Sequence, residues 1–272
     1  MSSRPTPRSH DTDRADADAP ASAEEVQIVA ASRALDDGDV CFVGIGLPST
    51  ACNLARLLHA PDIVLIYESG TLQTRPEVLP LSIGDGELCE TALTTVPVPE
   101  MFQYWLQGGR ISKGFLGGAQ IDRFANINST VIGPYDRPTV RLPGAGGAPE
   151  IAAHCAETII TASHSPRVFV EQVEFITTYG HGRGHGERAR LGLTTLGPTL
   201  VVTDLCQMRP DPETSELVVT ALHEGVTAGQ VVEATGWAPR FAADLATTPA
   251  PTAEELRTLR ELRARTAEAH RA

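Results

Sequence analysis

Five short apolar runs, separated by helix-like stretches, constrain the fold of this chain more than any other feature of its sequence. The apolar runs lie at residues 40–45, 62–67, 111–116, 157–162 and 199–203. The helix-like stretches lie between several of them, at residues 49–59, 98–107 and 147–156. Continuous apolar runs are typical of strands buried on both faces, and their alternation with helices is typical of βαβ units. The sequence therefore predicts an α/β fold with an open, largely parallel sheet and flanking helices.

The two ends of the chain are polar but predict different structures. Residues 1–21 contain too little apolar surface to offset the entropy of ordering, so we expect a disordered N-terminal arm. Ser22 and Glu25 have capping-box spacing and precede an apolar stripe, which predicts the first helix. Residues 252–271 have the apolar spacing of an amphipathic helix. We therefore expect one domain over residues 22–272.

Charge and cysteine content exclude several classes of protein. The formal net charge is −12, so the chain lacks the basic surface on which nucleic-acid binding depends. Its cysteines are odd in number and never in C-x-x-C spacing, which argues against a disulfide scaffold or a structural zinc site. No apolar stretch approaches the roughly 20 residues that cross a bilayer, and residues 1–20 contain no apolar signal segment. We expect a cytoplasmic protein without a membrane anchor.

Glycines gather in four segments that can form tight loops. These are "VGIGLP" (43–48), "LGGAQ" (116–120), "PGAGGAP" (143–149) and "YGHGRGHG" (179–186). The first is no dinucleotide fingerprint, because Pro48 and Ser49 stand where a third glycine is needed. The chain contains neither a P-loop motif nor a G-x-S-x-G elbow. Loops next to strand ends can line the ligand crevice of a parallel sheet, and their amides can hold an anion.

Two histidines in the last of these segments raise the question of a metal site. His181 and His185 have the spacing that brings two imidazoles together on a helix. The alternating glycines at 180, 182, 184 and 186 oppose a stable helix. We therefore predict no metal site, and interpret the segment as a mobile or substrate-facing loop.

Glu68 follows the apolar run Ile63–Tyr67 and stands directly before Ser69 and Gly70. The ordinary interpretation of such an acid is a solvated side chain in a strand-to-helix loop. Two features favour a functional role: the acid adjoins a fully apolar strand, and the residues after it do not cap a helix. A carboxylate at the end of a buried strand can act as a nucleophile or as a base.

Several segments, in order along the chain, resemble those of one enzyme family. They are "VGIGLPSTACNLARLLHAPDIVLIYESG", "FLGGAQIDRFANINST", "GPYDRPTVRLPGAGGA" and "GERARLGLTTLGPTLVVTD". Together they resemble the B (beta) subunits of class I CoA-transferases, closest to the glutaconate CoA-transferase type, over residues 26–265. Ala125 is one departure, since the family often has glycine there. The resemblance implies the fold of this family.

The resemblance also implies roles for individual residues. Glu68 of "ESG" matches the family's covalent nucleophile, which carries CoA as a glutamyl thioester. In the same way, Gly144, Gly146 and Gly147 match a glycine loop expected to bind the oxyanion and the CoA thioester. The residues expected to shape the site are Ser69, Gly70, Gly117, Gly118 and Gln120. Asp122, Asn126 and Asn128 are interpreted as structural groups that satisfy turn amides.

The same resemblance implies partners and leaves alternatives open. A homologous A (alpha) subunit would share the active site, in a heterodimer or a dimer of heterodimers. An acyl-CoA and a carboxylic acid, with a dicarboxylic acid as one candidate, would be the substrates, and no permanently bound cofactor or metal is implied. One alternative is a divergent relative that acts as a CoA-thioester hydrolase, ring-opening enzyme or decarboxylase; such relatives generally lack the B-subunit glutamate. Another is a non-catalytic partner that completes an A-subunit site.

Overall fold

The first described residues lead directly into the predicted first helix. The computed structural model describes residues 19–271, so the predicted arm at 1–21 lies almost wholly outside the described residues. Within them, Nη2 of Arg260 donates to the carbonyl oxygen of Ala19 at 3.0 Å. Helix α2 (Ala23–Ser32) follows, and Ser22 caps it through the predicted capping box, with Glu25 N donating to Ser22 Oγ at 3.2 Å.

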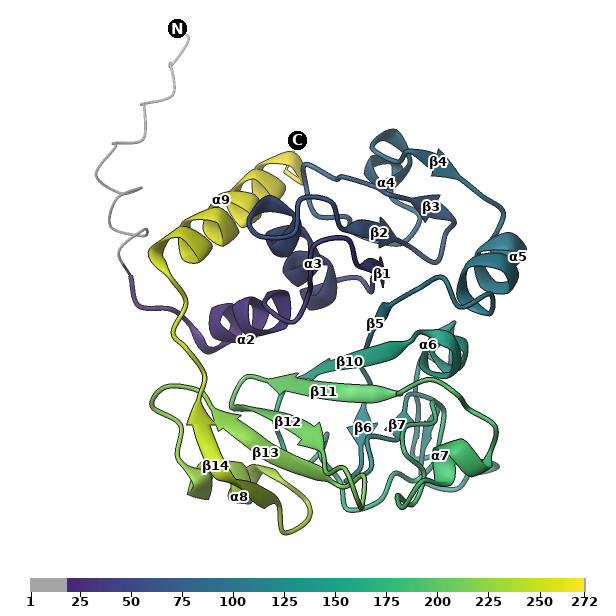
Figure 1. Cartoon of the computed structure of the whole chain (residues 1–272), viewed down its shortest axis with the longest axis vertical. Coiled ribbons are helices and arrows are strands. Elements are labelled where there is room, and N and C mark those ends of the chain that lie inside the picture. The colour runs from purple at the N-terminus through teal and green to yellow at the C-terminus, as the bar shows by residue number, and fades with distance from the viewer. Residues whose placement is uncertain (1–18, 272) are drawn as a thin grey trace, which may run out of the picture.

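A ten-stranded sheet organises the structure (Figure 1). Its strand order is β14-β13-β12-β11-β10-β5-β1-β2-β3-β4. The five central strands are parallel: β11 (Pro198–Thr203), β10 (Glu157–Ala162), β5 (Lys113–Leu116), β1 (Val40–Phe42) and β2 (Val64–Ile66). These are the five predicted strands, so the predicted fold class is confirmed.

The margins of the sheet depart from the parallel alternation. On one side β3 (Thr71–Leu72) and β4 (Thr94–Thr95) pair antiparallel. On the other side β12 (Cys206–Pro210) and β13 (Leu217–Leu222) continue antiparallel from β11, and β14 (Arg240–Thr247) is parallel to β13. Two small antiparallel pairs complete the strands: β6 (Gln120–Ile121) with β7 (Ile127–Asn128), and β8 (Val131–Ile132) with β9 (Val140–Arg141).

Both faces of the central sheet are covered by apolar packing. Alternate strand residues enter two separate core clusters, as the two-residue period of a strand requires. One cluster contains Cys41, Leu65, Phe115, Ile159 and Val202. The other contains Phe42, Ile66, Leu116, Ile160 and Val201. This double burial explains why the strands are continuous apolar runs instead of alternating ones.

Helices from opposite ends of the chain share one face of the sheet. Helices α2, α3 (Leu47–Leu57) and α9 (Ala253–Ala269) contact one another there (Figure 1). Helix α6 (Ala148–His154) packs against β5 and β10 with the other cluster. The remaining α-helices are short: α4 (Gly86–Glu90), α5 (Val98–Glu100), α7 (Glu187–Arg190) and α8 (Ala228–Ala234). Within the described chain, none of the helices has the length and hydropathy of a membrane span.

The helix predicted at residues 98–107 is only partly an α-helix. After α5 the chain forms a π-helix, η1 (Met101–Leu106). Gln107 N donates to Phe102 O at 2.8 Å, and Arg110 N donates to Trp105 O at 3.0 Å, so each bond spans five residues. Such π segments are rare and frequently occur at functional sites.

His164 is a buried histidine whose ring has only neutral hydrogen-bond partners. It is 7% exposed, its ring nitrogens lie 3.1 Å and 3.0 Å from the hydroxyls of Thr203 and Thr235, and it stacks on Phe169 at 4.2 Å. Burial lowers the pKa of His164 from near 6.5 to about 4, partly offset by the charge of Asp204. The imidazole is therefore neutral in the folded protein at pH 7.

This buried imidazole predicts a loss of stability in mild acid. In the unfolded chain His164 binds a proton as pH falls below 6.5, because its pKa is then the ordinary one. In the folded chain its pKa is about 4, so it stays neutral until the pH approaches that value. The free energy of unfolding should therefore decrease by about 2–3 kcal/mol between pH 7 and 4.5 through this group. Urea titrations of the wild type and His164→Gln should show a shallower pH dependence for the variant. Equal dependences would contradict a neutral folded-state imidazole.

Candidate active site

Glu68 lies at the carboxyl end of β2, in the turn of a hairpin. Gly70 N donates to Tyr67 O at 2.9 Å, so Glu68 and Ser69 are the central residues of a tight turn that leads into the antiparallel strand β3. The strand-to-helix loop of the ordinary interpretation is therefore wrong. Tyr67 anchors the turn, because its fully buried hydroxyl lies 2.8 Å from Ser49 Oγ on α3, and burial raises the pKa of this phenol.

Gly70 is required by this turn for two reasons. Its φ is +103°, a conformation that favours glycine, and a methyl group there would lie 2.0 Å from the carbonyl oxygen of Val96. We expect Gly70→Ala to lower the free energy of unfolding by about 1–3 kcal/mol, measured by chemical denaturation. Gly86→Ala is a matched control, because nothing lies within 4 Å of the added methyl group. An equal effect of both variants would refute the close packing at Gly70.

The glycine loop before α6 meets the Glu68 side chain directly. A methyl group placed on Gly147 would lie 2.9 Å from Oε1 of Glu68 and 2.8 Å from Cζ of Phe102. The backbone of Gly147 is ordinary, with φ −85°, so close approach and not conformation requires glycine here. Glu68 is half-buried, and its carboxylate has no hydrogen-bond or ion-pair partner among the described residues.

The amides of this loop are available to a ligand. Gly144 and Gly146 have positive φ values of 109° and 50°, which shape the turn. Gly144 N donates to Ser129 O at 2.8 Å, whereas the amides of Gly146 and Gly147 donate to no described residue. The hydroxyl of Ser69 is also buried and, within residues 19–271, unpartnered. Free donors therefore lie beside an unpaired carboxylate.

A cavity of about 370 Å³ lies at the carboxyl ends of the strands beside β2. Gly117, at the end of β5, lines it together with Gly44 and Ile45 after β1 and Thr161 and Ser163 at the end of β10. In parallel sheets, ligands bind in the crevice outside these ends. Gly117 thus lines a cavity at the strand ends, but Glu68 and the Gly144–Gly147 loop do not line it. The part of Gly117 in the site stays a prediction.

Two other predicted site residues, Gly118 and Gln120, are tied into local packing. A methyl group on Gly118 would lie 2.1 Å from Cγ2 of Ile127. Gln120 is 5% exposed; its Nε2 donates to Glu174 at 3.0 Å and its Oε1 accepts from Asn128 at 2.8 Å. These contacts hold both residues in the hairpin of β6 and β7 and account for them structurally. Their part in the site stays a prediction.

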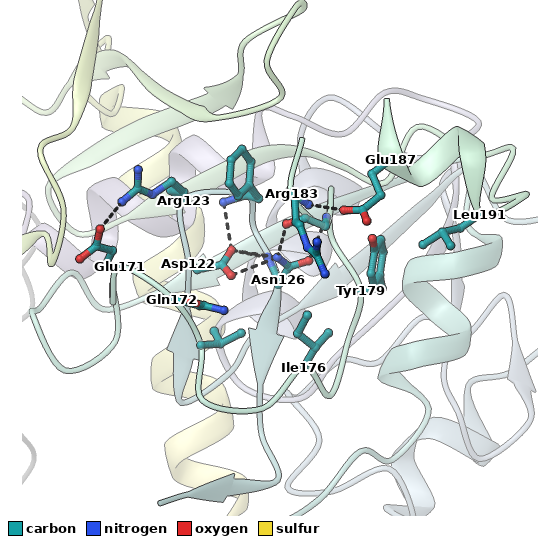
Figure 2. Close-up of a pocket in the computed structure, with 13 residues that line it drawn as sticks. Asp122, Arg123, Asn126, Glu171, Gln172, Ile176, Tyr179, Arg183, Glu187 and Leu191 are labelled. Carbon is teal, nitrogen blue, oxygen red and sulfur yellow. Dashed lines mark hydrogen bonds and ion pairs between the residues drawn. The ribbon is translucent and has the colours of Figure 1, made fainter. Parts of the chain in front are cut away.

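A larger cavity, of about 880 Å³, is likewise not lined by Glu68 (Figure 2). Several of its polar groups are engaged with one another: Asp122 accepts from Asn126 Nδ2 at 3.0 Å, and Arg123 pairs with Glu171 at 2.8 Å (Figure 2). Burial raises the pKa of Asp122, although hydrogen bonds from Asn126 oppose this. The structural interpretation is confirmed: Asp122 Oδ1 accepts from the turn amides of Phe124 and Asn126, and Asn126 Oδ1 accepts from two backbone amides of the glycine-rich histidine segment.

The glycine-rich histidine segment is packed and holds no grouped metal ligands. His181 is 8% exposed and its Nε2 lies 2.8 Å from Pro198 O, and burial lowers the pKa of its imidazole. A methyl group on Gly180 or Gly184 would lie 2.2 Å or 2.1 Å from a backbone oxygen. His185 is exposed. Among residues 19–271, no three His, Cys, Asp or Glu side chains are grouped to hold a metal ion.

One residue beside Glu68 was not predicted from the sequence. Phe102, on η1, lies beside Gly147 as the Glu68 carboxylate does, although it is distant in sequence from both Glu68 and Gly147. The only local signal is an aromatic-rich helical stretch, "MFQYWL", which is equally typical of ordinary core packing.

Comparison with known proteins agrees with this architecture. The model of the coenzyme A transferase family matches residues 25–234, and the chain belongs to this family. It is 60% identical to the B (beta) subunit of 3-oxoadipate CoA-transferase from Pseudomonas knackmussii, over 92% of this chain and 96% of that one. A crystal structure of glutaconate coenzyme A-transferase from Acidaminococcus fermentans superimposes with a TM-score of 0.83 at 32% identity, covering 89% of this chain and 94% of that one. The predicted resemblance is confirmed.

A more distant relative carries a different activity. The chain is 27% identical to the cholesterol ring-cleaving hydrolase IpdB subunit of Mycobacterium tuberculosis, over 88% of this chain and 92% of that one. The relatives of this chain are therefore named for hydrolysis as well as for transfer.

Proposed function

We propose that this protein is the B subunit of a heteromeric acyl-CoA:carboxylate CoA-transferase in which Glu68 is the covalent nucleophile. One observation carries the proposal: an unpaired carboxylate meets a glycine loop with free amides at the carboxyl ends of parallel strands. A homologous A subunit completes the site, since the matching relatives are named as B subunits.

The chemistry requires a carboxylate that is ionised and unhindered. An oxygen of Glu68 attacks the acyl carbonyl carbon of an acyl-CoA; the C–S bond breaks, giving a mixed anhydride and the CoA thiolate. The thiolate attacks Cδ of Glu68, the anhydride C–O bond breaks, and the first acid leaves as its carboxylate. A second carboxylate runs both steps in reverse on the glutamyl–CoA thioester. The cycle neither consumes nor releases a proton, and its kinetics are ping-pong.

Each attack creates a tetrahedral oxyanion next to the glycine loop. The amides of Gly146 and Gly147 are the donors that best fit this charge, because they donate to no described residue and belong to the loop whose Gly147 adjoins the carboxylate. The buried hydroxyl of Ser69 is a third candidate. Loss of one good oxyanion donor typically raises a barrier by about 2.7–4 kcal/mol. Donors fixed in a backbone need no reorganisation during the reaction.

The substrates follow from the relatives. CoA thioesters are the substrates of the coenzyme A transferase family. Identity of 60% to a chain of 3-oxoadipate CoA-transferase makes 3-oxoadipate, or a dicarboxylic acid like it, the preferred acid. We infer that no permanent cofactor or metal takes part, because the glutamate itself carries the CoA. The free cysteines of the chain, four of them buried, fit a cytoplasmic location.

Hydrolysis by the same site is the second candidate function. The relative named as a ring-cleaving hydrolase supports it, but at 27% identity against 60% for the named transferase. In a hydrolase, Glu68 would serve as general base for water and would never be acylated. A non-catalytic role would leave Glu68 without any contribution to turnover.

A covalent adduct distinguishes these functions. The protein is co-expressed with its A subunit and incubated with a panel of CoA thioesters of mono- and dicarboxylic acids, without an acceptor acid. Peptide mass spectrometry should then find CoA on Glu68, and hydroxylamine should convert the adduct to a hydroxamate. Turnover of the thioester without a trappable adduct would favour hydrolysis with Glu68 as base.

A further inference from the structure

The π-helix η1 brings an aromatic ring to the Glu68 carboxylate. The tip of the Phe102 ring, at Cζ and Cε1, lies 2.8 Å and 3.0 Å from the position of a methyl group on Gly147, and Oε1 of Glu68 lies 2.9 Å from it. Phe102 belongs to the π turn itself, because its carbonyl oxygen accepts the five-residue bond from Gln107 N.

The ring is held from the side of the core. The Phe102 and Phe42 ring centroids are 6.1 Å apart with planes tilted by 57°, and Phe42, the last residue of β1, is 2% exposed. Tyr104, on the same π turn, is 53% exposed and stacks under the Arg110 guanidinium at 3.8 Å. The π turn thus sends one ring toward Glu68 and another toward solvent.

We propose that Phe102 is a shielding residue that keeps water away from acylated Glu68; this rests on the proposed function. In the unwanted step a water oxygen bonds to Cδ of Glu68 and the C–S bond of the thioester breaks. Free CoA takes one proton of the water as a thiol, the other proton is released, and the Glu68 carboxylate returns. No acid receives CoA in this step, so it wastes the thioester.

The edge of an aromatic ring is well suited to excluding water from acylated Glu68. Aromatic carbon offers no hydrogen bond that would hold or orient water, and exclusion of water protects reactive intermediates in enzymes. Glycine at position 147 lets the ring tip and the carboxylate both approach the space that a side chain there would occupy. Phe102 thus determines the partition between transfer and hydrolysis, while Glu68 performs the chemistry.

The test compares partition ratios in the assembled enzyme. The complex of both subunits, carrying wild-type protein, Phe102→Ala or Phe102→Leu, is incubated with the acyl-CoA that forms the Glu68 adduct. The decay of the adduct without acceptor and the transfer rate with acceptor are measured separately. We expect Phe102→Ala to raise the ratio of hydrolysis to transfer about tenfold, and Phe102→Leu to raise it less, since it keeps part of the apolar wall.

Tyr104→Ala is the matched control, because it removes an aromatic ring from the same π turn on the solvent side and should leave the ratio unchanged. If Phe102→Ala fails to assemble, Phe102→Leu decides. An unchanged ratio in every Phe102 variant that forms the adduct would overturn the shielding role and leave the proposed function intact. A wild-type complex that forms no adduct would overturn both.

Discussion

Replacing Glu68 by glutamine should lower the rate of CoA transfer by more than about 10⁴-fold, because the amide has the shape of the carboxylate but cannot form the anhydride. The fold should not suffer, since the Glu68 side chain has no hydrogen-bond or ion-pair partner within the described chain and is only half-buried. The free energy of unfolding should therefore change by less than about 0.5 kcal/mol. Exchange of labelled CoA between acyl-CoA and free acid measures the rate in the assembled complex.

Glu90→Gln is a suitable control, because Glu90 is an exposed acid at the end of α4 and the same chemical change is made. It should keep wild-type transfer and the Glu68 adduct. Retention of a tenth of the wild-type transfer rate in Glu68→Gln would exclude this carboxylate as the nucleophile. Complete loss of transfer with persistent thioester hydrolysis would point to a second water-activating group.

The central sheet could be predicted from sequence because its signal is local and strong. The apolar runs at 62–67 and 157–162 contain the strands β2 and β10, and neighbouring residues of each run enter opposite core clusters. A strand buried on both faces is largely apolar, so its boundaries are visible in the sequence. The strands at the margins of the sheet, such as the largely exposed β14, were not predicted.

The setting of Glu68 could be predicted only in part. Its place at the end of a buried strand follows from the apolar run before it, and its chemical role from the "ESG" resemblance. The hairpin that holds it depends on Gly70 fitting against the backbone of Val96, a contact with a residue far along the chain. A local pattern does not encode such a contact, and the hairpin was therefore not predicted.

The glycine loop at residues 143–149 could also be predicted only in part. Its glycine content predicts a tight turn with exposed amides, but three glycines look equivalent in the sequence. Only the structure separates Gly144 and Gly146, whose positive φ values shape the loop, from Gly147, whose missing side chain makes room for Glu68 and Phe102. Phe102 carries no signal of its own, because the switch from α to π hydrogen bonding depends on tertiary packing.

Adding one methyl group at Gly147 should reduce transfer by about 10²–10³-fold and barely change stability. The methyl group of Gly147→Ala would lie 2.9 Å from Oε1 of Glu68 and 2.8 Å from Cζ of Phe102, and both atoms are at the far ends of side chains that can move. The fold should therefore lose at most about 1 kcal/mol, as expected for Gly to Ala at an N-cap. A carboxylate displaced by about 1 Å no longer approaches the thioester correctly, which costs about 10²-fold, and disturbance of the oxyanion donors adds to this.

Comparing the transfer rate with the free energy of unfolding shows whether Gly147 is needed for catalysis or for stability. Gly229→Ala on α8 is the control, because the nearest atom to its added methyl group is 3.8 Å away, and it should leave transfer unchanged. Transfer rate and urea unfolding are measured on the same preparations, so that loss of rate at unchanged stability identifies displacement of Glu68. If Gly147→Ala keeps full activity, the Glu68 carboxylate reacts from a position away from the loop, and the amides of Gly146 and Gly147 do not bind the oxyanion.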